Sequence, residues 1–315
     1  MDWRFSWMEK KRKREGMIGI IESAASLNLV YGVLQREKLV VKAHQRVVAP
    51  TLSSRQAALK QFVIMHDLLG VETTYVLNPV EYHLTLLEEP LVAKEEVSQA
   101  IRWLLKDSIN YPIENAIVES FEVPYPRAKD NSKMVYAVAM NKNIVVKVEA
   151  LVNPSGATLK YIDIPELALC NLINENKEMS KGCVFVQLEA YGGKIILCRH
   201  EEICIARSID LKLKNLGENK EDDNALLETL ALEIQRSFDY LNSVFRQSVQ
   251  NVIVLAPSSL DNTLIKTSLS SALGAEVSLL NLEELVSFET PLSEAENKES
   301  LLAIGAILRQ RKVVS

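Results

Sequence analysis

The chain has 315 residues, 48% of them hydrophobic, and carries a formal net charge of −5 at pH 7. A chain of this length can bury a substantial core and is expected to divide into two lobes or domains. The mildly acidic charge disfavours a broad nucleic-acid-binding surface, because phosphate contacts need clustered Lys and Arg. No stretch supplies the ~18 uninterrupted apolar residues of a membrane-spanning helix, so we expect none.

The reactive residue types show no catalytic or metal-binding spacing. The four cysteines lie in apolar contexts without a CxxC pair, and the four histidines form no HExxH pair. Ser258-Ser259 lacks the GxSxG frame of a serine nucleophile. We therefore expect no catalytic residues and no metal site, and we interpret the cysteines as reduced core residues. They are Cys170, Cys183, Cys198 and Cys204.

Residues 1–15 differ from the rest of the chain in composition. Trp3, Phe5 and Trp7 precede an uninterrupted basic run that begins at Lys10 and ends at Arg14. Aromatic and basic side chains together suit the boundary between acidic lipid headgroups and acyl chains. The segment is therefore either a membrane-surface contact or a solvated, disordered tail, and composition leaves both open. No apolar h-region or cleavage site follows, so it is not a signal peptide.

Residues 16–180 are expected to form a first lobe that contains an inserted subdomain at about 81–141. Apolar runs at 17–21, 27–34 and 39–47 predict a three-stranded meander. The further elements expected here are a helix at 53–69, strands at 73–77 and 82–87, a helix at 93–109, strands at 116–123 and 134–140, a helix at 142–152, a strand at 159–164 and a helix at 166–173. The insertion thus has the order β-α-β-β.

Residues 181–315 are expected to form a second lobe, separated from the first by the polar stretch 174–181. The expected elements are strands at 183–188, 194–199 and 203–209, a long helix at 227–245, a strand at 252–255, a further helix, a strand at 276–280 and a helix at 299–310. Gly192 and Gly193 predict the first hairpin turn, because both glycines accept positive φ. We expect the C-terminal helix to pack back on the first lobe.

The long helix of the second lobe leads into a short buried strand. Its apolar residues recur at steps of three and four, and Asp222, Asp223 or Asn224 is expected to cap its start. Ligands of α/β sheets bind where such strands end. Here the strand ends at the turn Ala256-Pro257-Ser258-Ser259, without glycines.

Two lobes that each open with a three-stranded meander describe an α/β, two-lobed, duplicated actin-like fold. Four segments carry a more specific resemblance, to the PilM and MshI family of type IV pilus biogenesis proteins, with MshI of the mannose-sensitive haemagglutinin (MSHA) pilus system as the closer likeness. They are AIRWLLKDSINYPIENAIVESFEV at 100–123, DIPELALCNLI at 163–173, LALEIQRSFDYLNS at 230–243 and LLAIGAIL at 301–308. None of the matching segments is catalytic.

The resemblance implies a role as well as a fold. It implies an FtsA-like and PilM-like cytoplasmic protein, peripheral at the inner membrane, that acts as a scaffold. Its partner would be the short cytoplasmic N-terminal segment of a bitopic PilN-like protein, which it would link to the motor ATPase of the assembly machinery. The partner groove would lie between the first lobe and the insertion, with residues 93–123 as one wall. No motif assigns individual partner-binding residues.

Nucleotide-binding relatives place an Asp-containing turn of small residues in each lobe, because the Asp holds Mg²⁺ and the turn amides hold phosphates. The first-lobe motif of the family, GIDIGSSSVK, begins with a match at Gly19 and Ile20 and then diverges. Ile21 replaces its Asp, Ser23 its second Gly and Asn28 its Lys. Glu22 cannot replace the lost acid, since neighbouring strand residues point to opposite faces. Ser23 and Ser26 could bind an anion, but we favour a self-satisfied turn.

The second-lobe motif diverges as well. Gln187 stands in place of its Asp and Glu189 in place of its Gly. Gly192 and Gly193, with Lys194, could form a remnant anion loop, but we favour a plain hairpin turn. In nucleotide-binding relatives a glycine pair lies against the adenosine, where this chain has the turn that contains Pro257 and Ser258.

The leading hypothesis is therefore a non-enzymatic scaffold with a degenerate nucleotide site and no cofactor. Two alternatives remain: a nucleotide-dependent actin-like switch or weak ATPase that binds ATP with Mg²⁺, and a membrane-tethered, polymerising protein like FtsA. The missing acids at Ile21 and Gln187 oppose the first alternative, and the N-terminal segment would support the second.

Overall fold

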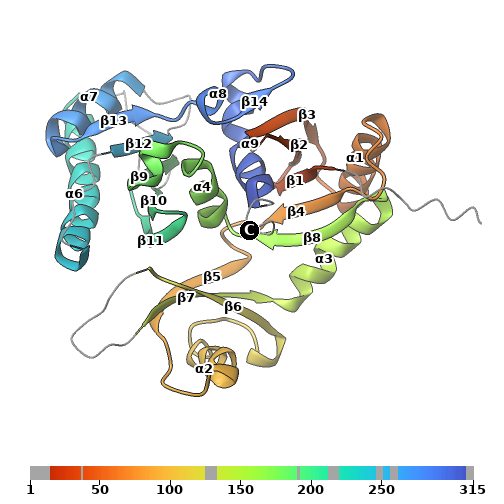
Figure 1. Cartoon of the computed structure of the whole chain (residues 1–315), viewed down its shortest axis with the longest axis horizontal. Helices are drawn as coiled ribbons and strands as arrows, with labels where there is room; N and C mark the ends of the chain where they lie inside the picture. Colours follow the sequence, from red (N-terminus) through yellow and green to blue (C-terminus); the bar gives the residue numbers. More distant parts are fainter. Residues whose placement is uncertain are drawn as a thin grey trace, which may run out of the picture.

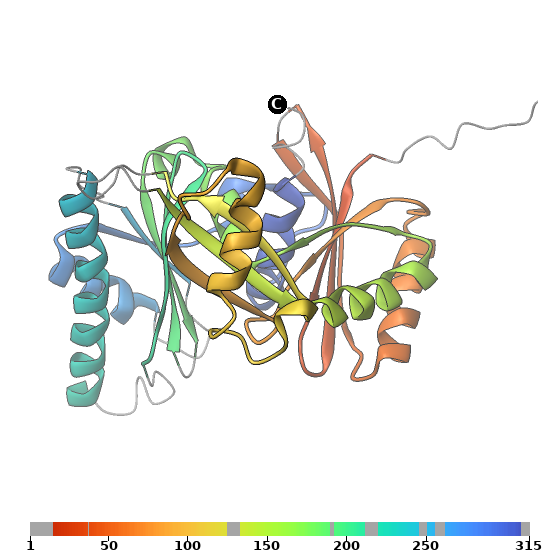
Figure 2. The ribbon, with the colours of Figure 1, turned by 90° about the horizontal axis from the view of Figure 1, so that it is seen from below.

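The computed structural model describes residues 15–36, 38–124, 133–189, 192–211, 220–245, 251–255 and 262–309. Its strands form three sheets, in the orders β14-β3-β2-β1-β4-β8, β11-β10-β9-β12-β13 and β5-β7-β6 (Figure 1). The first two sheets face each other across a layer of helices. Viewed from below, the third sheet lies across the junction between them (Figure 2).

The first sheet is an antiparallel meander extended by parallel strands. The meander is β1 (Met17–Glu22), β2 (Ser26–Gln35) and β3 (Lys38–Val48), and β4 (Glu72–Val76) and β8 (Thr158–Asp163) run parallel to β1. Residues of β1 alternate between the two faces. Ile18 and Ile20 pack beneath α1 (Leu52–Met65) and α3 (Lys142–Val152), whereas Met17 faces the junction between the lobes.

The second sheet repeats this plan. Its meander is β9 (Cys183–Glu189), β10 (Gly192–Arg199) and β11 (Glu202–Ile209), and β12 (Asn251–Leu255) and β13 (Glu276–Leu279) run parallel to β9. The helices α6 (Lys220–Phe245) and α7 (Asn262–Leu273) bury the outer face of this sheet. Both lobes therefore have helices on the outside of a mixed sheet.

Two helices fill the junction between the sheets. They are α4 (Pro165–Ile173), which begins with proline at its first position, and α9 (Glu294–Ile307). A Cβ on Gly19 of β1 would lie 2.4 Å from the carbonyl oxygen of Ala303, and one on Gly305 would lie 2.1 Å from that of Ala168. These glycines allow α9 to pack directly on β1 and on α4.

The segment before α9 returns the chain from the second sheet to the first. After β13 it forms α8 (Leu282–Leu285) and β14 (Ser287–Phe288), and β14 pairs in parallel with β3 of the first sheet. The short helix α5 (Lys177–Ser180) lies in the connection between the sheets. Sequence periodicity did not predict α8, β14 or α5, because each is only two to four residues long.

The third sheet is the insertion. It consists of β5 (Tyr82–Glu88), β6 (Ala116–Glu122) and β7 (Met134–Asn141), with α2 (Val97–Leu104) packed on one face. Single 3₁₀ turns occur at η1 (Lys94–Glu96), η2 (Ile113–Asn115) and, after α3, η3 (Asn153–Ser155). The order β-α-β-β is as expected, and the other face of this sheet packs toward the two lobes.

Several expected boundaries were wrong. The helix expected at 93–109 is α-helical over Val97–Leu104, and the one expected at 299–310 begins at Glu294, where Ser293 and Glu296 form a capping box. The described part of α6 begins at Lys220, so Asp222, Asp223 and Asn224 lie inside the helix and do not cap it. No helix among the described residues is long and apolar enough to cross a membrane.

The expected hairpin at Gly192-Gly193 was also misplaced. β10 already begins at Gly192, which pairs with Glu189, so both glycines lie within the strand and not in a turn. Gly192 has a φ of 138°, while Gly193 is needed for close approach: a Cβ there would lie 2.2 Å from the carbonyl oxygen of Gln187.

Candidate functional site

The first-lobe position that corresponds to the missing acid lies in an apolar contact. Ile21 is partly buried and packs against Val76 of β4, Ala168 of α4 and Ala306 of α9. Asn28, where the family motif has Lys, is buried and donates a hydrogen bond to the carbonyl oxygen of Glu299, at 3.4 Å. Neither side chain presents a charge toward the junction between the lobes.

The turn after β1 satisfies its own polar groups. The hydroxyl oxygens of Ser23 and Ser26 lie 2.6 Å apart, the Ser26 amide donates to the Ser23 hydroxyl, and the Ser23 amide donates to the Ser26 carbonyl. A bound anion would have to displace these bonds. This geometry is that of a closed serine turn.

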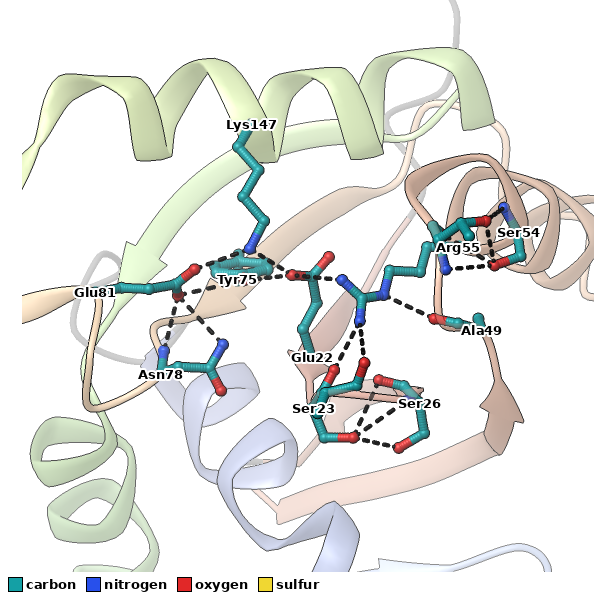
Figure 3. A network of polar contacts seen from close by, with 12 residues as sticks. Glu22, Ser23, Ser26, Ala49, Ser54, Arg55, Tyr75, Asn78, Glu81 and Lys147 are labelled. Carbon is teal, nitrogen blue, oxygen red and sulfur yellow. Dashed lines mark hydrogen bonds and ion pairs between the residues drawn. The ribbon is translucent and has the colours of Figure 1, made fainter.

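Glu22 is the charged residue at this strand end, and it points away from α9. Its side chain is 2% exposed, its Oε2 lies 3.4 Å from the guanidinium of Arg55, and the hydroxyl of Tyr75 donates to the same oxygen at 3.1 Å (Figure 3). Arg55 also donates to the carbonyls of Ser23 and Ala49. Arg55 therefore fastens the β1–β2 turn to α1.

The same network reaches the start of the insertion. Lys147 of α3 lies 2.7 Å from Oε2 of Glu22 and 2.8 Å from Oε1 of Glu81, and Glu81 also accepts from the backbone amide of Asn78 (Figure 3). Burial and the two carboxylates raise the pKa of Tyr75 far above its usual value. Burial lowers the pKa of Lys147, but its bonds to the two glutamates raise it overall. Two carboxylates face two cations, so the network has structural rather than acid–base character.

Lys194, the cation near the end of β9 in the second lobe, pairs with a residue of the first lobe. Lys194 of β10 lies opposite Gln187 in the sheet register, and its ammonium is 2.5 Å from Oε1 of Glu166, on α4. Lys194, which the alternative of a remnant anion loop would have offered to a phosphate, is therefore paired with a buried carboxylate. Glu189 ends β9, and Gly192 and Gly193 lie within β10.

Tyr82 of the insertion completes this contact. Its hydroxyl donates to Glu166, with oxygen–oxygen distances of 2.7 and 2.9 Å, and accepts from the Lys194 ammonium at 2.9 Å. Burial and the neighbouring carboxylate raise the pKa of Tyr82 far above its usual value. We call these three residues the junction triad, because β5, α4 and β10 each supply one member.

A cavity of about 350 Å³ lies on the second-lobe side of α9. It is lined mainly by apolar residues at the ends of β12 and β13, by α8, and by Asn297 and Lys298 of α9. Glu299, the next residue, carries the carbonyl that Asn28 contacts, so α9 separates this cavity from the first-lobe turn. Pro257 and Ser258, expected at an adenosine position, lie outside the described residues.

The four cysteines are buried and form no disulfide, as the sequence predicted. Burial raises the pKa of Cys183 to about 12 and that of Cys198 well above its usual value. Both thiols therefore stay protonated and unreactive. Within the described ranges, no group of three or more His, Cys, Asp or Glu residues could hold a metal ion.

The sequence identified the strand ends but missed most of the charged partners there. Arg55, Glu81 and Lys147 carry no motif, and neither do Tyr82 and Glu166. Lys147 meets Glu81 across 66 positions, and Lys194 meets Tyr82 across 112. One available signal was Glu166, an acid in the first turn of a helix that is otherwise apolar.

No family model matches the sequence, and no curated protein matches it. Among solved structures, the chain is similar to a PilM-PilN type IV pilus biogenesis complex, with 18% identity, a TM-score of 0.67, and coverage of 93% of this chain and 98% of that chain. It is also similar to a Bacteroides thetaiotaomicron protein with an actin-like ATPase fold and unknown function (13% identity, TM-score 0.49, 94% and 98% covered). A third similar structure is the cytoplasmic domain of EpsL of the Vibrio cholerae type II secretion system (12% identity, TM-score 0.49, 96% and 96% covered). At such identities the likeness shows the fold alone: the chain has the two-lobed actin-like fold, in a form similar to PilM.

Proposed function

We propose that this chain is a non-enzymatic scaffold of a type IV pilus assembly platform of the MSHA kind, located at the cytoplasmic face of the inner membrane. In this role it binds the cytoplasmic N-terminal segment of a PilN-like bitopic protein and links it to the assembly motor. The observation that carries the proposal is the likeness to the PilM-PilN complex over 93% of this chain and 98% of that one.

The strand ends support a scaffold rather than an ATPase. Ile21 packs against apolar side chains, the Ser23–Ser26 turn bonds to itself, and Lys194 is paired with Glu166. A phosphate would meet no free cation at the described part of either turn. Mg²⁺ would meet no carboxylate at the positions of Ile21 and Gln187.

The nucleotide prediction is tested by calorimetric titration of the full chain with Mg·ATP. We expect an affinity no tighter than the millimolar range, about −4 kcal/mol, and no hydrolysis. A nucleotide-binding actin-like protein serves as the positive control. Micromolar, Mg²⁺-dependent binding would instead favour a nucleotide-dependent switch.

The partner prediction is tested by copurification with a full-length PilN-like protein. Capture should survive deletion of the partner's periplasmic part and fail on deletion of its cytoplasmic tail. The reverse pattern would reject the proposed mode of binding.

The groove between the first lobe and the insertion can be tested separately. Val80 is 94% exposed and precedes Glu81 in the chain, and Val146 is exposed and precedes Lys147, so each adjoins a residue of the Glu81–Lys147 pair. We expect Val80→Glu or Val146→Glu to weaken capture of the partner. Leu232→Glu is the matched control, because Leu232 is 61% exposed on α6 of the second lobe. Equal capture by all three variants would refute this location while leaving the tail-deletion result intact.

The N-terminal segment, which lies outside the described residues, offers a membrane contact through Trp3, Phe5, Trp7 and the basic run from Lys10 to Arg14. Each cation near an anionic surface contributes ~1 kcal/mol, and salt screens this attraction. Removing residues 1–15 should therefore reduce sedimentation with anionic vesicles at low salt. Equal sedimentation of the truncated and intact chains would show that the segment is only a tail.

A further inference from the structure

The junction triad is a single buried polar contact at which three parts of the molecule meet. Tyr82 belongs to the insertion, Glu166 to the helix that closes the first lobe, and Lys194 to the second sheet. Each member contacts both of the others. The side chains of Glu166 and Lys194 are 5% and 16% exposed, so water screens the contact little.

Burial makes the three side chains interdependent. Without Lys194, the carboxylate of Glu166 would lose its cation and keep the hydrogen bond from the Tyr82 hydroxyl. Without the hydroxyl, both charges would lose a hydrogen bond in a site where a replacement from solvent is costly. Loss of any one side chain therefore weakens the interaction between the other two.

Two consecutive residues at the start of the insertion bind different parts of the molecule. Glu81 faces the first lobe, where it binds Lys147, and Tyr82 faces the junction, where it binds Glu166 and Lys194. Further along the insertion, the Tyr136 hydroxyl accepts a hydrogen bond from the backbone amide of Ala206 on β11, at 2.8 Å. The insertion thus touches two neighbouring strands of the second sheet, β10 and β11.

From this arrangement we propose that the junction triad is a latch, which couples movement of the insertion to movement of the second lobe. While the latch is closed, the insertion and the second sheet keep a fixed position on α4. When it opens, β5 and β10 loosen together although they belong to different sheets. A partner that binds the insertion then changes the dynamics of the second lobe without contacting the second lobe.

The latch is tested by amide hydrogen exchange on the full chain carrying Tyr82→Phe, which removes one hydroxyl and keeps the ring. We expect exchange in both β5 and β10 to become about tenfold faster or more, as loss of a hydrogen bond to a charged group predicts. Amides of α1 serve as an internal reference for global unfolding and should not change.

Tyr75→Phe is the matched control. It likewise removes a buried tyrosine hydroxyl that donates to a glutamate, but the hydroxyl of Tyr75 bonds to Glu22 in the first lobe and to Glu81 at the start of the insertion. We expect it to leave exchange in β10 unchanged. Faster exchange in β10 for Tyr75→Phe, or in β5 alone for Tyr82→Phe, would overturn the latch.

Lys194→Met approaches the same contact from the second lobe. The proposal requires that it speed exchange in β5, across the junction, and that the double variant with Tyr82→Phe be no faster there than the quicker single variant. Additive effects would show two independent local contacts. If Lys194→Met fails to fold, Lys194→Arg keeps the charge but alters the geometry, and it must accelerate β5 and β10 in the same ratio for the latch to stand.

Discussion

The two lobes share one skeleton but use their charged residues in opposite ways. Each has an antiparallel meander followed by two parallel strands, with β1 corresponding to β9. In the first lobe, the buried Glu22 at the end of β1 points away from α9. It pairs with Arg55 of α1 and Lys147 of α3, which belong to the same lobe. In the second lobe, Lys194 lies beside the end of β9 and pairs with Glu166 of the first lobe. The comparison shows that Glu22 and Lys194 are both paired with opposite charges within the protein.

The inner faces of the two sheets also differ. At the middle of β1 lies Gly19, which lets α9 approach to backbone contact, whereas the inner face of β9 carries Cys183 and Phe185. The C-terminal helix docks on the first sheet, to which β14 has already returned the chain from the second. Gly19 is one of two glycines, with Gly305, that allow α9 to pack directly on β1 and α4.

The largest expected loss of stability follows from removing a cation that pairs with Glu22 in the first lobe. Arg55→Met would leave the buried Glu22 short of a cation and several carbonyls without a donor, so we expect the free energy of unfolding to fall by about 3–5 kcal/mol. Urea denaturation measures this. Arg46→Met is the control, because the Arg46–Glu299 pair is on the surface and should contribute about 0–1 kcal/mol. Equal losses would refute the distinction.

Next in size is the close approach of α9. Gly19→Ala places a Cβ within 2.4 Å of the Ala303 carbonyl, and we expect a loss of about 1–3 kcal/mol with faster amide exchange in α9. Gly193→Ala is the second-lobe counterpart, with a Cβ 2.2 Å from the Gln187 carbonyl. It should disturb pairing of β9 with β10 and leave α9 protected. Faster exchange in α9 for both variants would remove the difference between the lobes.

Alkaline pH tests the buried tyrosines on both sides of the comparison. Burial raises the pKa of Tyr136 to about 12, and the pKa values of Tyr75 and Tyr82 are also raised. Above about pH 10 the unfolded chain ionises while the folded chain keeps its protons, so stability is full below this pH and falls above it. The expected slope is about 1.4 kcal/mol per pH unit for each such tyrosine.

The measurement for this prediction is urea unfolding across the alkaline range, with phenolate absorbance as a second readout. Tyr75→Phe and Tyr82→Phe should each reduce the loss of stability per pH unit by the contribution of one tyrosine, about 1.4 kcal/mol. A stability that stays level well above pH 10 would contradict the burial of these hydroxyls.

The smallest expected effect is at the first-lobe turn. Ser23→Ala removes the hydroxyl that bonds to Ser26, and we expect a loss of about 0.5–1.5 kcal/mol. Phosphate or nucleotide should not change the melting temperature of either protein. Stabilisation of the parent chain by phosphate, lost in the variant, would show that the turn binds anions after all.

Local sequence patterns predicted most of the elements. The three strands of each meander, the strand order of the insertion and α4 with its leading Pro165 lie within a few residues of their expected places. Alternation and helical periodicity depend on which residues face the core, and this information is local. That Ile21 and Gln187 replace acids of nucleotide-binding relatives stays a prediction from the family resemblance.

Tertiary structure decided which charges meet. The sequence favoured a plain hairpin turn before Lys194, with a remnant anion loop as the alternative, and packing gave this lysine Glu166 and Tyr82 as partners. The sequence showed Glu22 as an acid that could not replace the missing one, and packing gave it two cations. It likewise could not show that Gly19 and Gly305 admit α9 between the lobes. An ion pair depends on distance and burial, which are set when elements far apart in the chain pack together, and no period or spacing along the chain records them.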